Sequence, residues 1–216
     1  MKLYGFWRSL ASYRVRVALH LKGIAFEETP INLLSGAQHS DDYRKVNPQA
    51  VIPALIDGNG PPIFQSLAIL EYLDEVHPSP PLLPKDARAR ARVRGLAQIV
   101  ACDAHPLVVP RIRTYLEKDL ALDEPARNTW LQHWTAKGLA ALEANLAGNP
   151  ATGRFCQGDN VTLADICIAS QVVGAAFFSV DTKPYPTAVR IFGDCMKMDA
   201  FAISHPLKQP GAPASH

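Results

Sequence analysis

Short apolar runs alternate with helical periods along the first 84 residues of this chain. Residues 12–24 (SYRVRVALHLKGI) show a helical period whose apolar members share one side: Val15, Ala18, Leu19 and Leu21. The predicted elements are, in order, a strand at 2–7, a helix at 12–24, a strand at 26–33, a short helix at 41–46, a hairpin at 51–57 and 61–64, and a helix at 66–76. This order predicts an α/β domain over residues 1–84.

A proline-rich span at residues 77–86 (HPSPPLLPKD) interrupts the helical pattern and marks a linker. Beyond it the pattern is helical nearly throughout, with helices expected at 87–118, 125–147, 163–178 and 187–202. Residues 85–216 are therefore predicted to form an all-α domain, whose tail from residue 205 is expected to be loosely ordered. Thr162 and Asp165 have the spacing of a capping box, so removal of Asp165 is expected to cost much stability.

Composition is that of an ordinary folded protein. Hydrophobic residues make up 48% of the 216 residues, charged residues make up 19%, and the formal net charge is +2. This charge does not indicate a nucleic-acid partner, and the arginines of residues 88–94 (RARARVR) fall on more than one helix face. No uncharged apolar stretch of about 18 residues occurs, so no membrane span is expected. The four cysteines form no C-x-x-C pair and have no metal-like spacing, so no metal site is expected. Arg8 interrupts the first apolar run, so no signal peptide is expected, and a reducing, cytoplasmic setting fits best.

The stretch from Phe6 to Arg16 (FWRSLASYRVR) places two serines at a helix start with no acidic residue beside them. Helix N-termini expose N–H groups and carry about half a positive charge, so they stabilise thiolates, phosphates and carboxylates. Ser9 has no neighbouring base in the sequence, so its chemical role would be to donate a hydrogen bond to a ligand's anion. The alternative is a plain N-cap at Ser9 or Ser12, which local chemistry by itself favours.

Two further segments have the chemistry of a ligand clamp. Pro53 opens a strand, and a cis Ile52–Pro53 bond would turn the preceding backbone N–H and C=O toward a peptide-like ligand. A trans proline at the start of an edge strand is the alternative. Gln65 and Ser66 stand at the next helix start, where no glutamate completes a capping box and an external carboxylate can bind. A plain N-cap at Ser66 is compatible with that role.

His105 lies in an apolar segment, between Asp103 and Pro106. A lone histidine in such a place is more often a structural residue than a catalyst. No second histidine stands four residues on, and no cysteine pair joins it, so metal binding has no support.

Together these segments resemble the zeta class of the glutathione transferases. The resemblance runs from KLYGFWRSLASYRVRVALHLKGI through NPQAVIPALI, QSLAILEYLDEVHPSPPLLP, CDAHPL, GDNVTLADICIASQV and VDTKPYP to AFAISHPLKQP, and so covers nearly the whole chain. It implies a thioredoxin-like N-terminal domain, an all-helical C-terminal domain and a homodimer.

The resemblance also implies roles for individual residues. Ser9 matches the serine that hydrogen-bonds the glutathione thiolate, and Ile52, before a cis Pro53, matches the residue whose backbone pairs with the cysteinyl unit. Gln65 and Ser66 match the clamp on the γ-glutamyl unit.

Four further candidates follow from position. Gln38 and His105 lie in segments that resemble glutathione-contacting parts of the family. Arginine forks bind carboxylates at two points, so Arg8, beside Ser9, is a candidate for catalysis and substrate binding, and Arg111, beyond His105, for substrate binding.

The chain departs from the family pattern at three places. Ala11 stands where the zeta signature usually has a cysteine, so direct thiol assistance from that site is excluded. The family often has an asparagine near Val108 and Val109 and an arginine near Ala176 and Phe177, where this chain is apolar. A lost two-point contact to a buried carboxylate costs on the order of a few kcal/mol, which favours an apolar electrophile over a dicarboxylate.

The resemblance implies an enzyme that uses glutathione as its cofactor and a small electrophile as its substrate. The expected reaction is cis–trans isomerisation of a maleyl-type keto acid, maleylacetoacetate or maleylpyruvate, in aromatic catabolism. One alternative is a transferase that conjugates or dehalogenates an apolar electrophile. Another is a non-catalytic protein of the same fold, against which the combination of Ser9, Pro53, Gln65 and Ser66 argues.

Overall fold

The computed structural model describes residues 1–213, and its contacts divide the chain into two compact units. The first unit contains Met1–Leu82 together with the segment from Lys197 onward, and the second contains Leu83–Met196. The division near residue 82 lies within the proline-rich span. The sequence pattern assigns everything beyond residue 84 to the helical domain, whereas in the structure the segment from Lys197 packs back onto the first unit.

A mixed four-stranded sheet forms the centre of the first unit. Its strands are β1 Lys2–Gly5, β2 Glu27–Pro30, β3 Ala54–Ile56 and β4 Ile63–Phe64. They stand in the order β2-β1-β3-β4, with β1 parallel to β2 and antiparallel to β3, and with β3 antiparallel to β4. The parallel crossover between β1 and β2 and the β3–β4 hairpin confirm the predicted α/β order.

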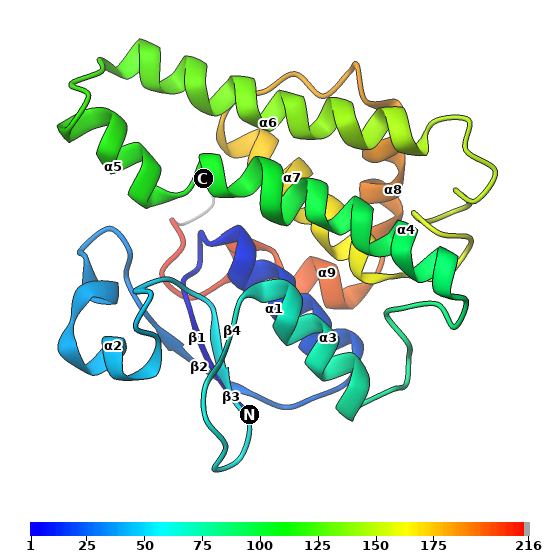
Figure 1. Cartoon of the computed structure of the whole chain (residues 1–216), viewed down its shortest axis with the longest axis horizontal. Coiled ribbons are helices and arrows are strands. Elements are labelled where there is room, and N and C mark those ends of the chain that lie inside the picture. The colour runs from blue at the N-terminus through cyan, green and yellow to red at the C-terminus, as the bar shows by residue number, and fades with distance from the viewer. Residues whose placement is uncertain (214–216) are drawn as a thin grey trace. The chain divides into compact units, whose positions relative to one another are not determined.

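The helices of this unit are α1 Leu10–Leu21, α2 Asp41–Val46, α3 Ser66–Val76 and α9 Asp199–Ser204. Helices α1 and α3 pack together on one side of the sheet, and α2 lies on the other side (Figure 1). Every residue of α1 from Leu10 to Leu19 is buried, and α3 and α9 both pack against this helix. The pattern predicts a single apolar side, so the burial of Arg14 and Arg16, each 1% exposed, differs from expectation.

The tail from His205 is ordered as far as the structure describes it, which corrects the sequence-based expectation. Residues Pro206–Lys208 form a 3-10 turn in which Pro206 is buried. The Gln209 side chain donates to the carbonyls of Ile203 (2.7 Å) and His205 (3.2 Å). Residues 214–216, which belong to the same expectation, lie outside the described residues.

The second unit is helical. Its main helices are α4 Ala87–Gln98, α5 Pro110–Lys118, α6 Glu124–Leu146, α7 Leu163–Phe177 and α8 Pro186–Met196. Helix α7 is the central one, because α4, α6 and α8 all pack on it and its residues from Leu163 to Ala175 are buried. Within residues 1–213, no helix is both long enough and apolar enough to cross a membrane.

Two helices that the sequence predicts as continuous are interrupted in the structure. The helix expected at 87–118 is interrupted by a π-helical stretch at Ile99–Ala104 and a 3-10 turn at His105–Leu107. Proline lacks an N–H group and its ring clashes with the preceding turn, so Pro106 and Pro110 suit these breaks. The helix expected at 187–202 is likewise two helices, α8 and α9, and they belong to different units.

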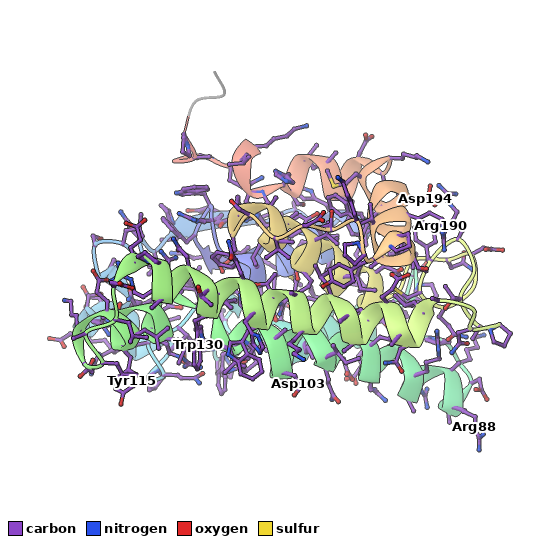
Figure 2. The ribbon with its side chains drawn as sticks, turned by 90° about the horizontal axis from the view of Figure 1, so that it is seen from above. Arg88, Asp103, Tyr115, Trp130, Arg190 and Asp194 are labelled. Atoms are coloured by element: carbon purple, nitrogen blue, oxygen red, sulfur yellow. The ribbon has the colours of Figure 1, made fainter. Side chains whose placement is uncertain are left out.

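Arginines from two helices hold the loop between α6 and α7. Arg92 of α4 and Arg190 of α8 both reach it, and Arg190 also lies 3.7 Å from the Asp194 carboxylate on its own helix (Figure 2). Their acceptors in the loop are the carbonyls of Gly153, Arg154 and Cys156 and the side chains of Thr152 and Gln157. Several backbone carbonyls that no regular element pairs are satisfied in this way.

Asp165 forms the predicted capping box and does more than cap α7. Its carboxylate accepts the Thr162 backbone N–H and hydroxyl, each over 2.7 Å, and also the Cys156 backbone N–H over 2.7 Å. The residue is fully buried. Burial raises the pKa of the Asp165 carboxyl, and the hydrogen bonds from Cys156 and Thr162 oppose that effect.

We predict that Asp165→Ala lowers the free energy of unfolding by roughly 3 kcal/mol or more, because two buried backbone donors lose their acceptor. Asp165→Asn keeps one acceptor oxygen and should cost less. The matched control is Asp123→Ala, which removes an exposed cap from the start of α6 and should cost about 1 kcal/mol. Urea denaturation of the three variants measures the difference, and equal losses for Asp165→Ala and Asp123→Ala would contradict the prediction.

Candidate active site

Ser9 stands at the point where β1 gives way to α1. Its N–H donates to the Phe6 carbonyl over 2.9 Å, which closes a turn, and its side chain accepts the Ser12 N–H over 3.1 Å as the N-cap of α1. A hydroxyl has one hydrogen to donate besides the lone pairs that accept, so Ser9 can cap the helix and still donate to a ligand. The two interpretations left open by the sequence are therefore compatible.

Ser12 does not cap the helix with its side chain, and that sequence-based interpretation is wrong. The Ser12 hydroxyl is fully buried and has no hydrogen-bond partner within the described part of the chain. Its backbone N–H is the group that the Ser9 cap satisfies.

The Ile52–Pro53 peptide bond is cis. Just before it, the Val51 carbonyl accepts both the Tyr43 hydroxyl and the Asn47 side-chain amide, each over 2.7 Å. Burial raises the pKa of the Tyr43 hydroxyl, so this donor keeps its proton at neutral pH. Among residues 1–213, nothing pairs with the Ile52 backbone N–H or carbonyl.

Gln65 precedes the first residue of α3 with a positive φ of 70°. The residue expected as a possible N-cap, Ser66, is instead the first helical residue, and no side chain in the described structure caps this helix. The Ser66 hydroxyl accepts a hydrogen bond from the buried Arg14 (3.1 Å). The Gln65 amide donates to the Gln49 side chain over 2.9 Å, which links the start of α3 to the segment that leads into the cis bond.

A hydrophobic cluster lies beneath these segments and brings them together. Its buried members are Phe6, Tyr43 and Ile52, and half-buried side chains packed against it are Tyr4, Trp7, Ile31, Leu33 and Val46. The turn before Ser9, the cis-proline segment and the stretch that leads to Gln38 thus share one apolar support. Gln38 itself lies in the 3-10 turn Ala37–His39, and its buried Oε1 atom has no partner among the described residues.

The remaining candidates differ in their surroundings. Arg8 is half-buried in the turn before Ser9. His105 and Arg111 belong to the second unit: His105 is half-buried at the start of a 3-10 turn, and Arg111 is exposed in the first turn of α5. The Trp130 indole of α6 donates to the Leu107 carbonyl over 2.8 Å and so fastens the turn that begins with His105 (Figure 2).

Sequence reasoning missed the residues that support the site. Arg14, Tyr43, Asn47 and Gln49 fix the segments on which the expected residues stand. The only available signal was the pair of arginines inside an otherwise apolar helix, since charged residues are almost never fully buried unless they are paired. No spacing rule would have found Gln49 or Asn47.

Comparison with known proteins identifies the family. A family model for the glutathione S-transferase N-terminal domain matches residues 1–75. Maleylpyruvate isomerase of Ralstonia sp is 45% identical over 210 residues, which cover 97% of this chain and 99% of that protein. Because so similar a relative spans almost the entire chain, the likeness is not confined to the first unit.

Solved structures give the same result. Maleylacetoacetate isomerase from Methylobacterium extorquens AM1, with bound malonate and GSH, is 52% identical with a TM-score of 0.97, and the match covers 99% of this chain and 100% of that one. Maleyl pyruvate isomerase, described as a bacterial glutathione S-transferase in the zeta class, is 44% identical with a TM-score of 0.95, covering 99% and 100%. This chain therefore belongs to the glutathione S-transferase family and, within it, to the zeta class.

Proposed function

We propose that this protein is a glutathione-dependent cis–trans isomerase of maleyl-type keto acids. The observation that carries the proposal is Ser9, a helix cap whose hydroxyl hydrogen remains available at the positive end of a buried helix. The relative from Ralstonia sp, 45% identical, is a maleylpyruvate isomerase, and the solved relative at 52% identity holds GSH together with a dicarboxylate.

The polar groups of the first unit fit a peptide with a thiol and carboxylates. The unpaired Ile52 backbone suits the amide groups of an extended tripeptide. The uncapped start of α3, with Gln65 and Ser66, suits its γ-glutamyl carboxylate. The unpartnered Gln38 Oε1 atom suits a donor of the same ligand. These residues would hold glutathione.

When bound, glutathione supplies a thiolate that adds to the double bond of a maleyl substrate, allows rotation about the resulting single bond and then leaves. Ser9 donates its hydroxyl hydrogen to the sulfur anion, and the first N–H groups of α1 add the favourable potential of the helix end. Both effects stabilise the thiolate over the thiol, so they lower the thiol pKa toward neutral pH.

The substrate's carboxylates need cationic partners in fixed positions. Arg8 is the nearest arginine to Ser9 in sequence, and Arg111 is exposed on α5. A planar guanidinium can contact a carboxylate at two points, so it can hold the substrate in register during rotation. We assign this role to Arg8 and Arg111.

A glutathione transferase that conjugates apolar electrophiles is the second candidate. The favouring observation is that the chain is apolar near the places where the family often has an asparagine and an arginine: Val108 is buried, Val109 and Phe177 are half-buried, and Ala176 is exposed. These side chains provide no donor to a carboxylate. The first test below separates the two activities.

We predict that purified protein isomerises maleylpyruvate or maleylacetoacetate only when glutathione is present, and that it consumes no glutathione. Substrate absorbance follows the isomerisation, and a thiol assay follows glutathione. Loss of thiol with a chlorinated aromatic electrophile, without isomerisation of either keto acid, would support the conjugating alternative. If calorimetry detects no glutathione binding, both functions are wrong.

We predict that Ser9→Ala raises the pKa of the bound glutathione thiol by about one to two units, because a hydrogen bond to a charged group contributes about 1.5–3 kcal/mol. Titration of the thiolate absorbance measures this pKa. The matched control is Ser12→Ala, which removes a buried hydroxyl without a described partner from the same helical turn and should leave the titration unchanged. An unchanged titration in Ser9→Ala would remove Ser9 from the proposed role.

We further propose a homodimer, a cytoplasmic location and a place in aromatic catabolism. The resemblance to the zeta class supports the dimer and the pathway, and the four free cysteines suit a reducing compartment. Gel filtration with light scattering should give about twice the 23.6 kDa of one chain. A single-chain mass at micromolar concentration would contradict the dimer.

A further inference from the structure

One buried guanidinium of α1 reaches two separate elements of the first unit. Arg16 donates through Nη1 to Oε1 of Glu28 in β2 over 2.9 Å, and through Nη2 to the Trp7 carbonyl over 3.2 Å. The Arg16 side chain is 1% exposed and that of Glu28 is 22% exposed. One bond therefore ends on β2 and the other on the turn before Ser9.

The Trp7 carbonyl belongs to the turn that delivers Ser9. That turn runs from Phe6 to Ser9 and is closed by the Ser9 N–H on the Phe6 carbonyl (2.9 Å). The peptide unit is planar, so a bond that fixes the Trp7 carbonyl also fixes the Arg8 N–H and limits rotation on both sides of it. Ser9 follows Arg8, so the direction of its hydroxyl depends on the orientation of the peptide plane between Trp7 and Arg8.

Glu28 is held close against the end of β1. A Cβ atom added at Gly5 would clash with the Glu28 Oε1 atom, so the glycine leaves the space that the carboxylate occupies. Burial raises the pKa of Glu28 and lowers that of Arg16, and the attraction between the two groups opposes both changes. The pair is therefore costly to bury, and by itself it is weak evidence for a role in stability.

A purely structural link between α1 and β2 requires the bond from Arg16 to Glu28 but not the bond from Arg16 to the Trp7 carbonyl. An apolar pair of similar size would join the two elements about as well as a buried ion pair does, and often better. It would leave the Trp7 carbonyl without a donor, however, and the turn before Ser9 free to move. The bond to Trp7 is thus the feature that a structural role leaves unexplained.

We propose that Arg16 and Glu28 are a positioning pair for the reaction: Glu28 orients the Arg16 guanidinium, and Arg16 holds the Trp7 carbonyl so that the Ser9 hydroxyl is aimed at the glutathione sulfur. This inference rests on the proposed function, because it concerns the role of Ser9. Neither residue contacts the reacting atoms. Their effect passes through the backbone of the turn.

The test uses Arg16→Lys in the full-length protein. Lysine keeps the charge but has a compact ammonium instead of a fork, so it cannot hold Glu28 and Trp7 in the same geometry. We expect the pKa of bound glutathione thiol to rise by about half a unit or more and kcat to fall about tenfold, since small misplacements of a catalytic group have effects of this order. The KM for glutathione should stay within about twofold, because the Ile52, Gln65 and Ser66 contacts are untouched.

The matched control is Arg92→Lys. Arg92 is also an arginine with several acceptors, but they lie in the loop between α6 and α7 of the second unit. This variant should lose stability and leave the thiol titration and kcat unchanged. Glu28→Gln, which keeps an acceptor oxygen for Nη1, should show a smaller effect than Arg16→Lys. Equal kinetic effects of Arg16→Lys and Arg92→Lys would overturn the proposal.

Amide hydrogen exchange in protein without glutathione provides an independent measurement. The Ser9 amide should exchange at least about tenfold faster in Arg16→Lys than in the wild type, since the turn is less firmly closed, and at the wild-type rate in Arg92→Lys. Gly5→Ala, which displaces the Glu28 carboxylate and keeps both charges, should accelerate the same amide. An unchanged exchange rate of the Ser9 amide in both Arg16→Lys and Gly5→Ala would overturn the positioning role.

The two proposals fail in different ways. If Ser9→Ala leaves the thiol titration unchanged, the role of Ser9 is wrong, and amide exchange still decides whether Arg16 fixes the turn. If Ser9→Ala shifts the titration and Arg16→Lys does not, the role of Ser9 stands and the positioning pair is refuted.

Discussion

The burial of helix α1 is the constraint on which the first unit depends. From Leu10 to Leu19 every side chain is buried, so the polar groups of this segment depend on partners inside the protein; the Ser12 hydroxyl has none among the described residues. The same helix begins just after the end of β1, and Ser9 is its N-cap. Burial along the helix and an accessible N-terminus together give a rigid element with a positive end suited to an anion.

The two buried arginines show how this constraint connects packing with chemistry. Arg14 donates to Ser66 at the start of α3, and Arg16 donates to Glu28 and to the turn before Ser9. Each therefore links α1 to a segment that carries a proposed glutathione contact. Buried polar groups also need partners in the second unit. There the Asp165 carboxylate accepts hydrogen bonds from backbone N–H groups around the start of the buried helix α7.

Local pattern predicted the elements well and their ends poorly. The α/β order, the hairpin and the Thr162–Asp165 capping box follow from spacing, because period and turn chemistry are local properties. Whether a serine caps a helix depends on the φ and ψ angles of one residue. The structure therefore selects Ser9 over Ser12 and begins α3 at Ser66.

By itself, the sequence determined the fold class, the family resemblance and the residue types needed for an anion-stabilising site, since these follow from periodicity and from short motifs. Only the tertiary structure decided that Arg14 and Arg16 are buried beneath that site, that Gln49 meets Gln65, and that the segment from Lys197 returns to the first unit. The physical reason is that these contacts join residues far apart in the chain. Their partners depend on how the elements pack, and no local period encodes that packing.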